Sequence, residues 1–263
     1  MTLELKNVSF TYPNGLTAIE NLNLKFHLGE SVAIIGQNGA GKTTTVKLMN
    51  GLLRPTAGEI YYDNQNLAAL SSAKIARKIG YVFQNPDDQI FQETIEREIT
   101  FGPKIQKMAK DEWQSQVKTA AKLCGLENYS NEHPYNLSYS KRKFITIAAV
   151  IATNPDVIIL DEPTAGQDKQ SVELLSTIIS ELVKQGKLVI TITHDMEFVA
   201  ENFSRVLVFA NHRLQKEGSP REIFWDENLL KLSHLQQPYI CQLAKEFGKK
   251  DILTMSELNE VLS

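Results

Sequence analysis

The sequence predicts an α/β fold: a mostly parallel sheet with an antiparallel N-terminal β portion, an inserted helical subdomain and a small C-terminal helical domain. Short β-branched apolar runs alternate with segments of helical periodicity, both before residue 84 and after residue 156. Such alternation favours parallel strands joined by crossover helices. Between these blocks, strand-like runs vanish over about 95–153. After 218–220 only short helical pieces remain.

The first elements are strands. Residues 2–11 alternate polar and apolar side chains, which indicates a strand with one buried face, and Pro13-Asn14-Gly15 forms a turn. A second strand spans 19–28 and ends at Gly29. Residues 31–35 are apolar and β-branched, as in a fully buried strand. The other elements expected before residue 84 are a helix over 42–53, a strand over 58–62, a helix over 71–78 and a strand over 80–83.

The remaining elements follow the same reasoning. We expect a helical subdomain over about 95–153, with its clearest periodicity in 111–124. The α/β alternation then resumes with strands over 157–160, 188–193 and 205–209 and helices over 168–185 and 195–202. We divide the chain into a larger domain, 1–226, and a C-terminal helical domain, 227–263.

Composition excludes some classes of function. The 263 residues are 42% hydrophobic and 22% charged, with a net charge of −3, which gives no basic footprint for nucleic acid. No segment approaches the roughly 20 apolar residues of a membrane-spanning helix, and the N-terminus lacks the layout of a signal peptide. Cys124 and Cys241 lie far apart and form no metal-ligand or redox motif, so we expect buried free thiols.

A glycine-rich loop carries the first functional motif. Residues 36–43 fit G-x-x-x-x-G-K-[ST], follow a buried strand and open a helix, which is the context of a phosphate-binding P-loop. Its backbone N–H groups and the helix N-terminus attract phosphate. Lys42 can reach the β- and γ-phosphates, and the Thr43 hydroxyl can ligate Mg²⁺. The sequence therefore predicts a P-loop NTPase core that binds ATP and Mg²⁺ through Gly36, Gln37, Asn38, Gly39, Ala40, Gly41, Lys42, Thr43 and Thr44.

Two acids end a later strand. Asp161 and Glu162 follow the apolar run 157–160. An apolar run followed by acids is usually only a strand leaving the core. Beside a P-loop, Asp161 suits the carboxylate that holds hydrated Mg²⁺, and Glu162 can act as general base on the attacking water.

With these motifs the chain resembles the ATPases of ATP-binding-cassette (ABC) transporters over about 1–225. Tyr12 stands where that family has an aromatic residue that stacks on adenine. Gln84 matches its glutamine that contacts Mg²⁺ and water, and His194 matches its switch histidine near the γ-phosphate. Residues 164–168 are similar to the loop that meets the partner subunit, with Gln167 in place of the usual Leu.

One motif departs from the family pattern. The signature Leu-Ser-Gly-Gly-Gln is Leu137-Ser-Tyr-Ser-Lys141 here. The resemblance places Ser138 against the nucleotide of the opposite subunit, whereas Tyr139 adds bulk where the family has glycine. A homodimer would carry this change at both sites. The sequence therefore favours a heterodimer with a related ATPase that keeps the glycines.

A closer resemblance comes from 83–89, Phe-Gln-Asn-Pro-Asp-Asp-Gln, and from the C-terminal tail. Both are similar to the ATPases of energy-coupling-factor (ECF) and cobalt-uptake transporters. That implies an ATP-hydrolysing subunit at the cytoplasmic face of the cell membrane, working with a transmembrane coupling protein and a membrane protein that captures a vitamin or transition-metal ion. Two alternatives stay open: a soluble ABC ATPase acting on nucleic acid or ribosomes, and a nucleotide-binding subunit that no longer hydrolyses ATP.

Overall fold

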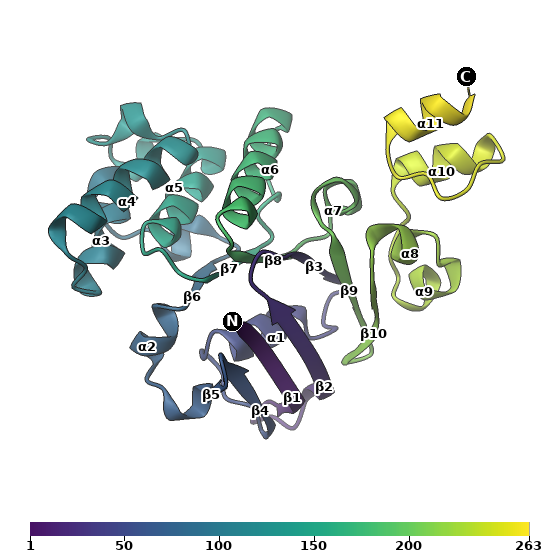
Figure 1. Cartoon of the computed structure of the whole chain (residues 1–263), viewed down its shortest axis with the longest axis horizontal. Helices are drawn as coiled ribbons and strands as arrows, with labels where there is room; N and C mark the ends of the chain where they lie inside the picture. Colours follow the sequence, from purple (N-terminus) through teal and green to yellow (C-terminus); the bar gives the residue numbers. More distant parts are fainter. Residues whose placement is uncertain (263) are drawn as a thin grey trace.

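A computed structural model describes residues 1–262, and its strands form two sheets (Figure 1). The four-stranded sheet has the order β2-β1-β4-β5, and the pairs are antiparallel. The six-stranded sheet has the order β10-β9-β3-β8-β7-β6, in which only β10 is antiparallel to its neighbour. The strands are β1 Thr2–Thr11, β2 Thr17–His27, β3 Ser31–Gly36, β4 Ala57–Tyr62, β5 Gln65–Asn66, β6 Ile79–Val82, β7 Val157–Asp161, β8 Leu188–Ile192, β9 Arg205–Ala210 and β10 Arg213–Gly218.

Helices surround the larger sheet. α3, α4 and α5 gather beyond one edge of it, and the C-terminal helices lie on the opposite side (Figure 1). The helices are α1 Lys42–Met49, α2 Ser72–Ala76, α3 Ile95–Ile105, α4 Lys110–Leu123, α5 Tyr139–Ile151, α6 Lys169–Lys184, α7 Met196–Asn202, α8 Pro220–Phe224, α9 Glu227–Leu232, α10 Tyr239–Glu246 and α11 Met255–Leu262. None of the helices within residues 1–262 is long and apolar enough to cross a bilayer.

The central strands explain why two cores form. Every residue of β3, β7 and β8 is buried, as expected of parallel strands covered on both faces. Side chains alternate between the faces of a strand. Accordingly Ala33 and Ile35 join one core cluster, whereas Val32 and Ile34 join the other. The first cluster includes residues of α3–α10, and the second joins residues of both sheets to α1.

The predicted fold class is confirmed, with local differences. The helix expected over 42–53 ends at Met49, because Asn50 leaves the helical conformation and Gly51 has a φ of 73°. The helix expected over 71–78 is only Ser72–Ala76. Strand β10 was not predicted, since its sequence, Arg-Leu-Gln-Lys-Glu-Gly, is polar. That polarity suits an edge strand, where charged side chains discourage pairing with other chains.

The C-terminal helices pack in two ways. Cys241 and Leu253 belong to the large core cluster, whereas Ala244, Ile252 and Leu258 form a small cluster of their own. The Trp225 indole N–H donates to the Ile252 carbonyl at 3.1 Å, which fastens the tail to α8. The division into 1–226 and 227–263 stays a prediction.

Candidate functional site

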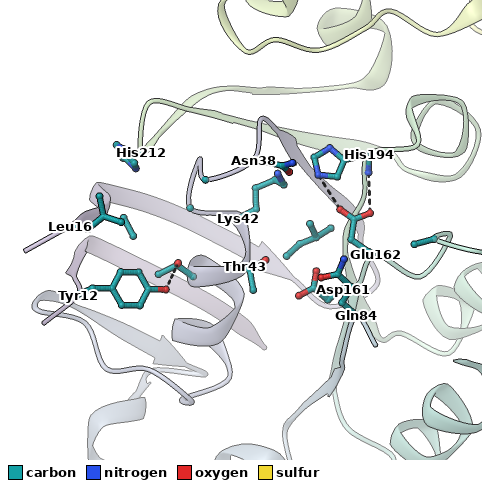
Figure 2. Close-up of a pocket in the computed structure, with 16 residues that line it drawn as sticks. Tyr12, Leu16, Asn38, Lys42, Thr43, Gln84, Asp161, Glu162, His194 and His212 are labelled. Carbon is teal, nitrogen blue, oxygen red and sulfur yellow. Dashed lines mark hydrogen bonds and ion pairs between the residues drawn. The ribbon is translucent and has the colours of Figure 1, made fainter. Parts of the chain in front are cut away.

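The parallel strands bring the predicted site residues to one edge of the sheet. Gly36 ends β3 and Asp161 ends β7, while Gln84 follows β6 and His194 follows β8. Ligands of open α/β sheets bind at this edge, outside the carboxyl ends of the strands. A pocket of about 560 Å³ lies there (Figure 2). The predicted residues that line it are Tyr12, Asn38, Gly39, Gly41, Lys42, Thr43, Thr44, Gln84, Asp161, Glu162 and His194.

Other predicted residues do not line this pocket. Gly36, Gln37 and Ala40 belong to the same loop but are absent from the pocket wall, and Ser138 lies on a different element. Conversely, the wall includes residues that were not predicted: Leu16, Ala18, Ala165, Ile192 and His212. Leu16 and His212 lie in turns that carry no motif, so only the folded structure could bring them here.

The glycine-rich loop needs its glycines for space as well as for backbone conformation. Gly41 has a φ of 100°, and a Cβ there would lie 2.4 Å from the Ala18 carbonyl oxygen. At Gly36, whose φ is 147°, a Cβ would lie 2.1 Å from the Phe209 carbonyl oxygen. Because there is no room for a side chain at either glycine, the loop backbone lies close against β2 and β9. The result is a fixed backbone cradle that opens directly into helix α1.

Lys42 is the cation of the loop. Its side chain is buried, and Nζ donates to the carbonyl oxygens of Gly36 at 2.7 Å and Gln37 at 3.0 Å. Burial lowers the pKa of Lys42, while the charges of Glu162 and Asp161 oppose that shift. The loop therefore holds a cation beside two carboxyl groups, where an anionic phosphate chain would be bound.

Asp161 is buried and lines the same pocket as Thr43 and Gln84 (Figure 2). Its carboxylate accepts a hydrogen bond from the Tyr81 hydroxyl at 2.6 Å, a contact that the sequence did not reveal. Burial raises the pKa of Asp161. A hydroxyl, an amide and a carboxylate offer the oxygen ligands that Mg²⁺ prefers, so Thr43, Gln84 and Asp161 fit a site for this cation.

Glu162 and His194 form a pair. The His194 Nε2 lies 3.2 Å from Glu162 Oε1, and the His194 backbone N–H donates to Oε2 at 3.3 Å. Desolvation, followed by the charge of Asp161, raises the pKa of Glu162 to about 7, and desolvation lowers the pKa of His194. Both shifts favour the neutral form of the side chain, and the two groups lie within hydrogen-bond distance of each other. Glu162 also has a φ of 47°, a strained value that is concentrated at functional sites.

Tyr12 lies at the other end of the pocket. Its hydroxyl is 2.9 Å from the Thr44 hydroxyl, and its ring packs edge-to-face on Phe10 with centroids 4.8 Å apart. Thr44 belongs to α1, so the hydroxyl contact ties Tyr12 to the phosphate-binding loop. An aromatic ring fixed in this way offers a flat apolar surface on which a nucleotide base can stack.

The departing segment 137–141 lies outside the pocket, at the start of α5. The Ser138 hydroxyl caps this helix by accepting the Lys141 N–H at 3.3 Å. Ser140 Oγ donates to Gln167 Oε1 at 2.5 Å, and the Tyr139 ring covers Gly166, where a Cβ would meet it at 3.2 Å. The two departures from the family pattern, at 139–141 and at 167, therefore contact each other within one chain.

Comparisons with known proteins agree with this geometry. Residues 19–165 match the family model described as "ABC transporter". The chain is 37% identical to the energy-coupling factor transporter ATP-binding protein EcfA of Methanocaldococcus jannaschii, over 95% of this chain and 90% of that one. The EcfA of Methanothermobacter thermautotrophicus is also 37% identical, over 92% of this chain and 78% of that one.

A solved structure extends the likeness to three dimensions. cbiO1 of Clostridium perfringens, described as part of the ABC transporter complex cbiONQ, superposes with a TM-score of 0.80 at 32% identity. It covers 92% of this chain and 98% of its own. The chain therefore belongs to the ABC transporter family, as an ATP-binding subunit of the energy-coupling-factor type.

Proposed function

We propose that this chain hydrolyses ATP to power an ECF-type importer of a vitamin or transition-metal ion across the cytoplasmic membrane. The observation that carries the proposal is the pocket that joins Lys42 of the glycine-rich loop to the Glu162–His194 pair. The relatives named above are an energy-coupling factor transporter ATP-binding protein and a part of the ABC transporter complex cbiONQ. In this role the chain works as a peripheral subunit at the cytoplasmic face of the membrane.

Each part of the pocket has a task in this proposal. The loop 36–41 and Lys42 bind the phosphates, and Tyr12 holds the adenine. Thr43, Gln84 and Asp161 hold Mg²⁺, which neutralises charge on the phosphates when bound. Glu162 accepts a proton from the attacking water. A pKa of about 7 suits a general base, because such a group is substantially deprotonated at neutral pH and still basic enough to take the proton. The His194 N–H groups orient this carboxylate.

Purification from the native membrane tests the assignment directly. A tagged copy of this chain should co-purify with a related ATPase, a transmembrane coupling protein and a small membrane protein. Recovery of ribosomal proteins or nucleic acid, with no membrane protein, would instead favour a soluble ABC ATPase. The net charge of −3 argues against that alternative.

We propose that segment 84–104 docks onto the transmembrane coupling protein. A groove of about 370 Å³ runs beside α3, and its wall includes the exposed rings of Phe91 and Phe101, which pack edge-to-face at 4.6 Å. Exposed, paired aromatic rings are typical of binding surfaces. Asp87 pairs with Arg142 at 2.9 Å, so reversing its charge would also disturb α5, whereas Asp88 is exposed.

The structure therefore suggests a cleaner docking test than reversing the charges of both acids. Phe91→Glu places a charge on the groove without removing an internal ion pair. It should lower ATP-driven uptake while leaving ATP binding intact. Leu232→Glu changes an exposed apolar residue of α9, away from the groove, and serves as the matched control. Normal uptake by Phe91→Glu would remove the groove from the docking surface.

We also propose that the chain works beside a related ATPase rather than a second copy of itself. A dimeric ATP-binding cassette bound to ADP and phosphate is among the similar structures, with a TM-score of 0.75 at 29% identity, covering 83% of this chain and 98% of its own. In this chain Tyr139 and Ser140 are engaged with the chain's own residues 166–167. They are therefore poorly placed to replace the signature glycines against a partner's nucleotide. Hydrolysis by the chain alone should be weak, and addition of the related ATPase should restore it.

A further inference from the structure

Lys143 is a buried cation to which the proposed mechanism assigns no role. It lies in the second turn of α5, and its exposed fraction is 0%. Burial of an unpaired ammonium is costly, so a lysine in such a place needs compensating contacts. Among the ion pairs of residues 1–262, none involves Lys143. Its compensation must therefore come from another source.

That compensation comes from two backbone carbonyls at the edge of the pocket. Lys143 Nζ donates to the carbonyl oxygen of Phe83 at 3.3 Å and also to that of Gln84. Strand β6 ends at Val82, so these two carbonyls follow the last residue of the strand. From the other side, the Phe83 N–H donates to Gln89 Oε1 at 3.0 Å. The backbone of residues 83–84 is thus bound by two side chains, those of Lys143 and Gln89.

The charge of Lys143 also faces the acidic side of the pocket. Burial lowers its pKa to about 8, and the charges of Asp161 and Glu162 oppose that shift. Most of the Lys143 population is therefore charged at neutral pH. The ammonium contacts the backbone of Phe83 and Gln84, whereas Lys42 approaches the same two carboxyl groups from the glycine-rich loop.

We propose that Lys143 is a positioning residue, which fixes the Gln84 backbone so that the Gln84 amide faces Asp161 and the nucleotide. It thereby connects the first turns of α5, including the departing segment 137–141, to the hydrolytic site. This inference rests on the proposed function, because Gln84 has a task only if the pocket hydrolyses ATP. It assigns a role to a residue of α5 that lies five positions beyond Ser138, the N-cap of this helix.

The test is a double-mutant cycle in the assembled complex, with steady-state ATP hydrolysis and Mg²⁺ titration as readouts. Lys143→Met keeps an unbranched side chain that is one atom shorter and removes its donors. We expect kcat to fall at least tenfold, the KM for ATP to stay within about threefold, and the Mg²⁺ concentration for half-maximal rate to rise. Lys143→Arg, which keeps donors and charge, should recover part of the rate. Lys184→Met is the control, because Lys184 is exposed on α6, pairs with Glu181 and does not line the pocket.

The second arm of the cycle is Gln84→Ala. If Lys143 acts through Gln84, the double variant should be little worse than Gln84→Ala alone, because coupled residues are not additive. Fully additive losses, or an unchanged kcat in Lys143→Met, would overturn the inference. Should Lys143→Met fail to fold by thermal melting, Lys143→Gln takes its place under the same criteria. Failure of the proposed function itself would look different, since Glu162→Gln and Lys42→Ala would then also leave hydrolysis unchanged.

Discussion

Replacement of Glu162 by glutamine isolates the chemical step from nucleotide binding. The Glu162 side chain is 12% exposed, and both of its oxygens contact His194. Glutamine has the same shape, and its amide can keep these contacts, since its oxygen accepts the His194 backbone N–H and its NH₂ donates to a neutral imidazole. Lys42 and the loop are untouched. We therefore expect ATP to bind with nearly unchanged affinity.

The rate should behave differently, because an amide cannot take a proton from water. A general base contributes about 10²- to 10⁴-fold, which corresponds to about 2.7–5.4 kcal/mol of transition-state stabilisation. We expect kcat in the assembled complex to fall at least a hundredfold. Phosphate release measures the rate, and titration with a fluorescent ATP analogue measures affinity. Glu173→Gln, at a side chain of α6 that is 67% exposed, is the control. A Glu162→Gln complex that hydrolyses ATP at nearly the normal rate would refute the assignment.

Three further predictions follow from the geometry. Lys42→Ala should weaken ATP binding at least tenfold in the same titration, because it removes the cation that faces the phosphates; unchanged affinity would contradict this role. Gly41→Ala should abolish ATP binding, because its Cβ would collide with the Ala18 carbonyl, whereas Gly29→Ala, which carries a similar backbone strain at a φ of 82° but meets no atom within 4 Å, should bind ATP normally. Hydrogen bonds from the Leu253 N–H and from Arg221 hold the pKa of Glu257 below its usual 4.5. Its contribution to stability is therefore present above pH 4.5 and lost as the pH falls through the lowered pKa. The protection of the amides in 239–262, measured against their intrinsic exchange rates, should therefore fall in acid before that of β3. An equal loss of protection in both segments would refute this order.

Much of the fold could be predicted, because the hydrophobic pattern of the sequence agrees with the burial of the strands in the structure. The buried runs at 32–35 and 157–160 have no polar residue to place in solvent, so they become central strands. Strand β10 could not be predicted this way, because an edge strand needs no apolar pattern and takes its position from the neighbouring β9. The early end of α1 depends on Gly51, whose positive φ stops the helix in spite of the apolar residues that follow.

The candidate site also contains residues that the sequence pattern predicts and residues that only the folded structure shows. The glycine-rich loop, Asp161 and Glu162 were visible because their chemistry demands fixed residues at fixed spacing. Tyr81 and Lys143 were not, because each acts on its partner across the fold, over a sequence separation of about 80 residues for Tyr81 and Asp161 and about 60 for Lys143 and Phe83. No spacing rule relates such pairs. Likewise, the contact between Ser140 and Gln167 joins two departures that looked independent in the sequence.

The most direct test of the account is ATP-driven uptake by the complex that co-purifies with this chain. The complex is reconstituted into vesicles, ATP is supplied on the side of the ATPases, and accumulation of the ligand bound by the co-purified capture protein is followed. We predict uptake that requires Mg²⁺ and ATP with the native chain, and none above background when the chain carries Glu162→Gln. Uptake at the native rate by the Glu162→Gln complex would contradict the claim that hydrolysis in this chain's pocket powers import.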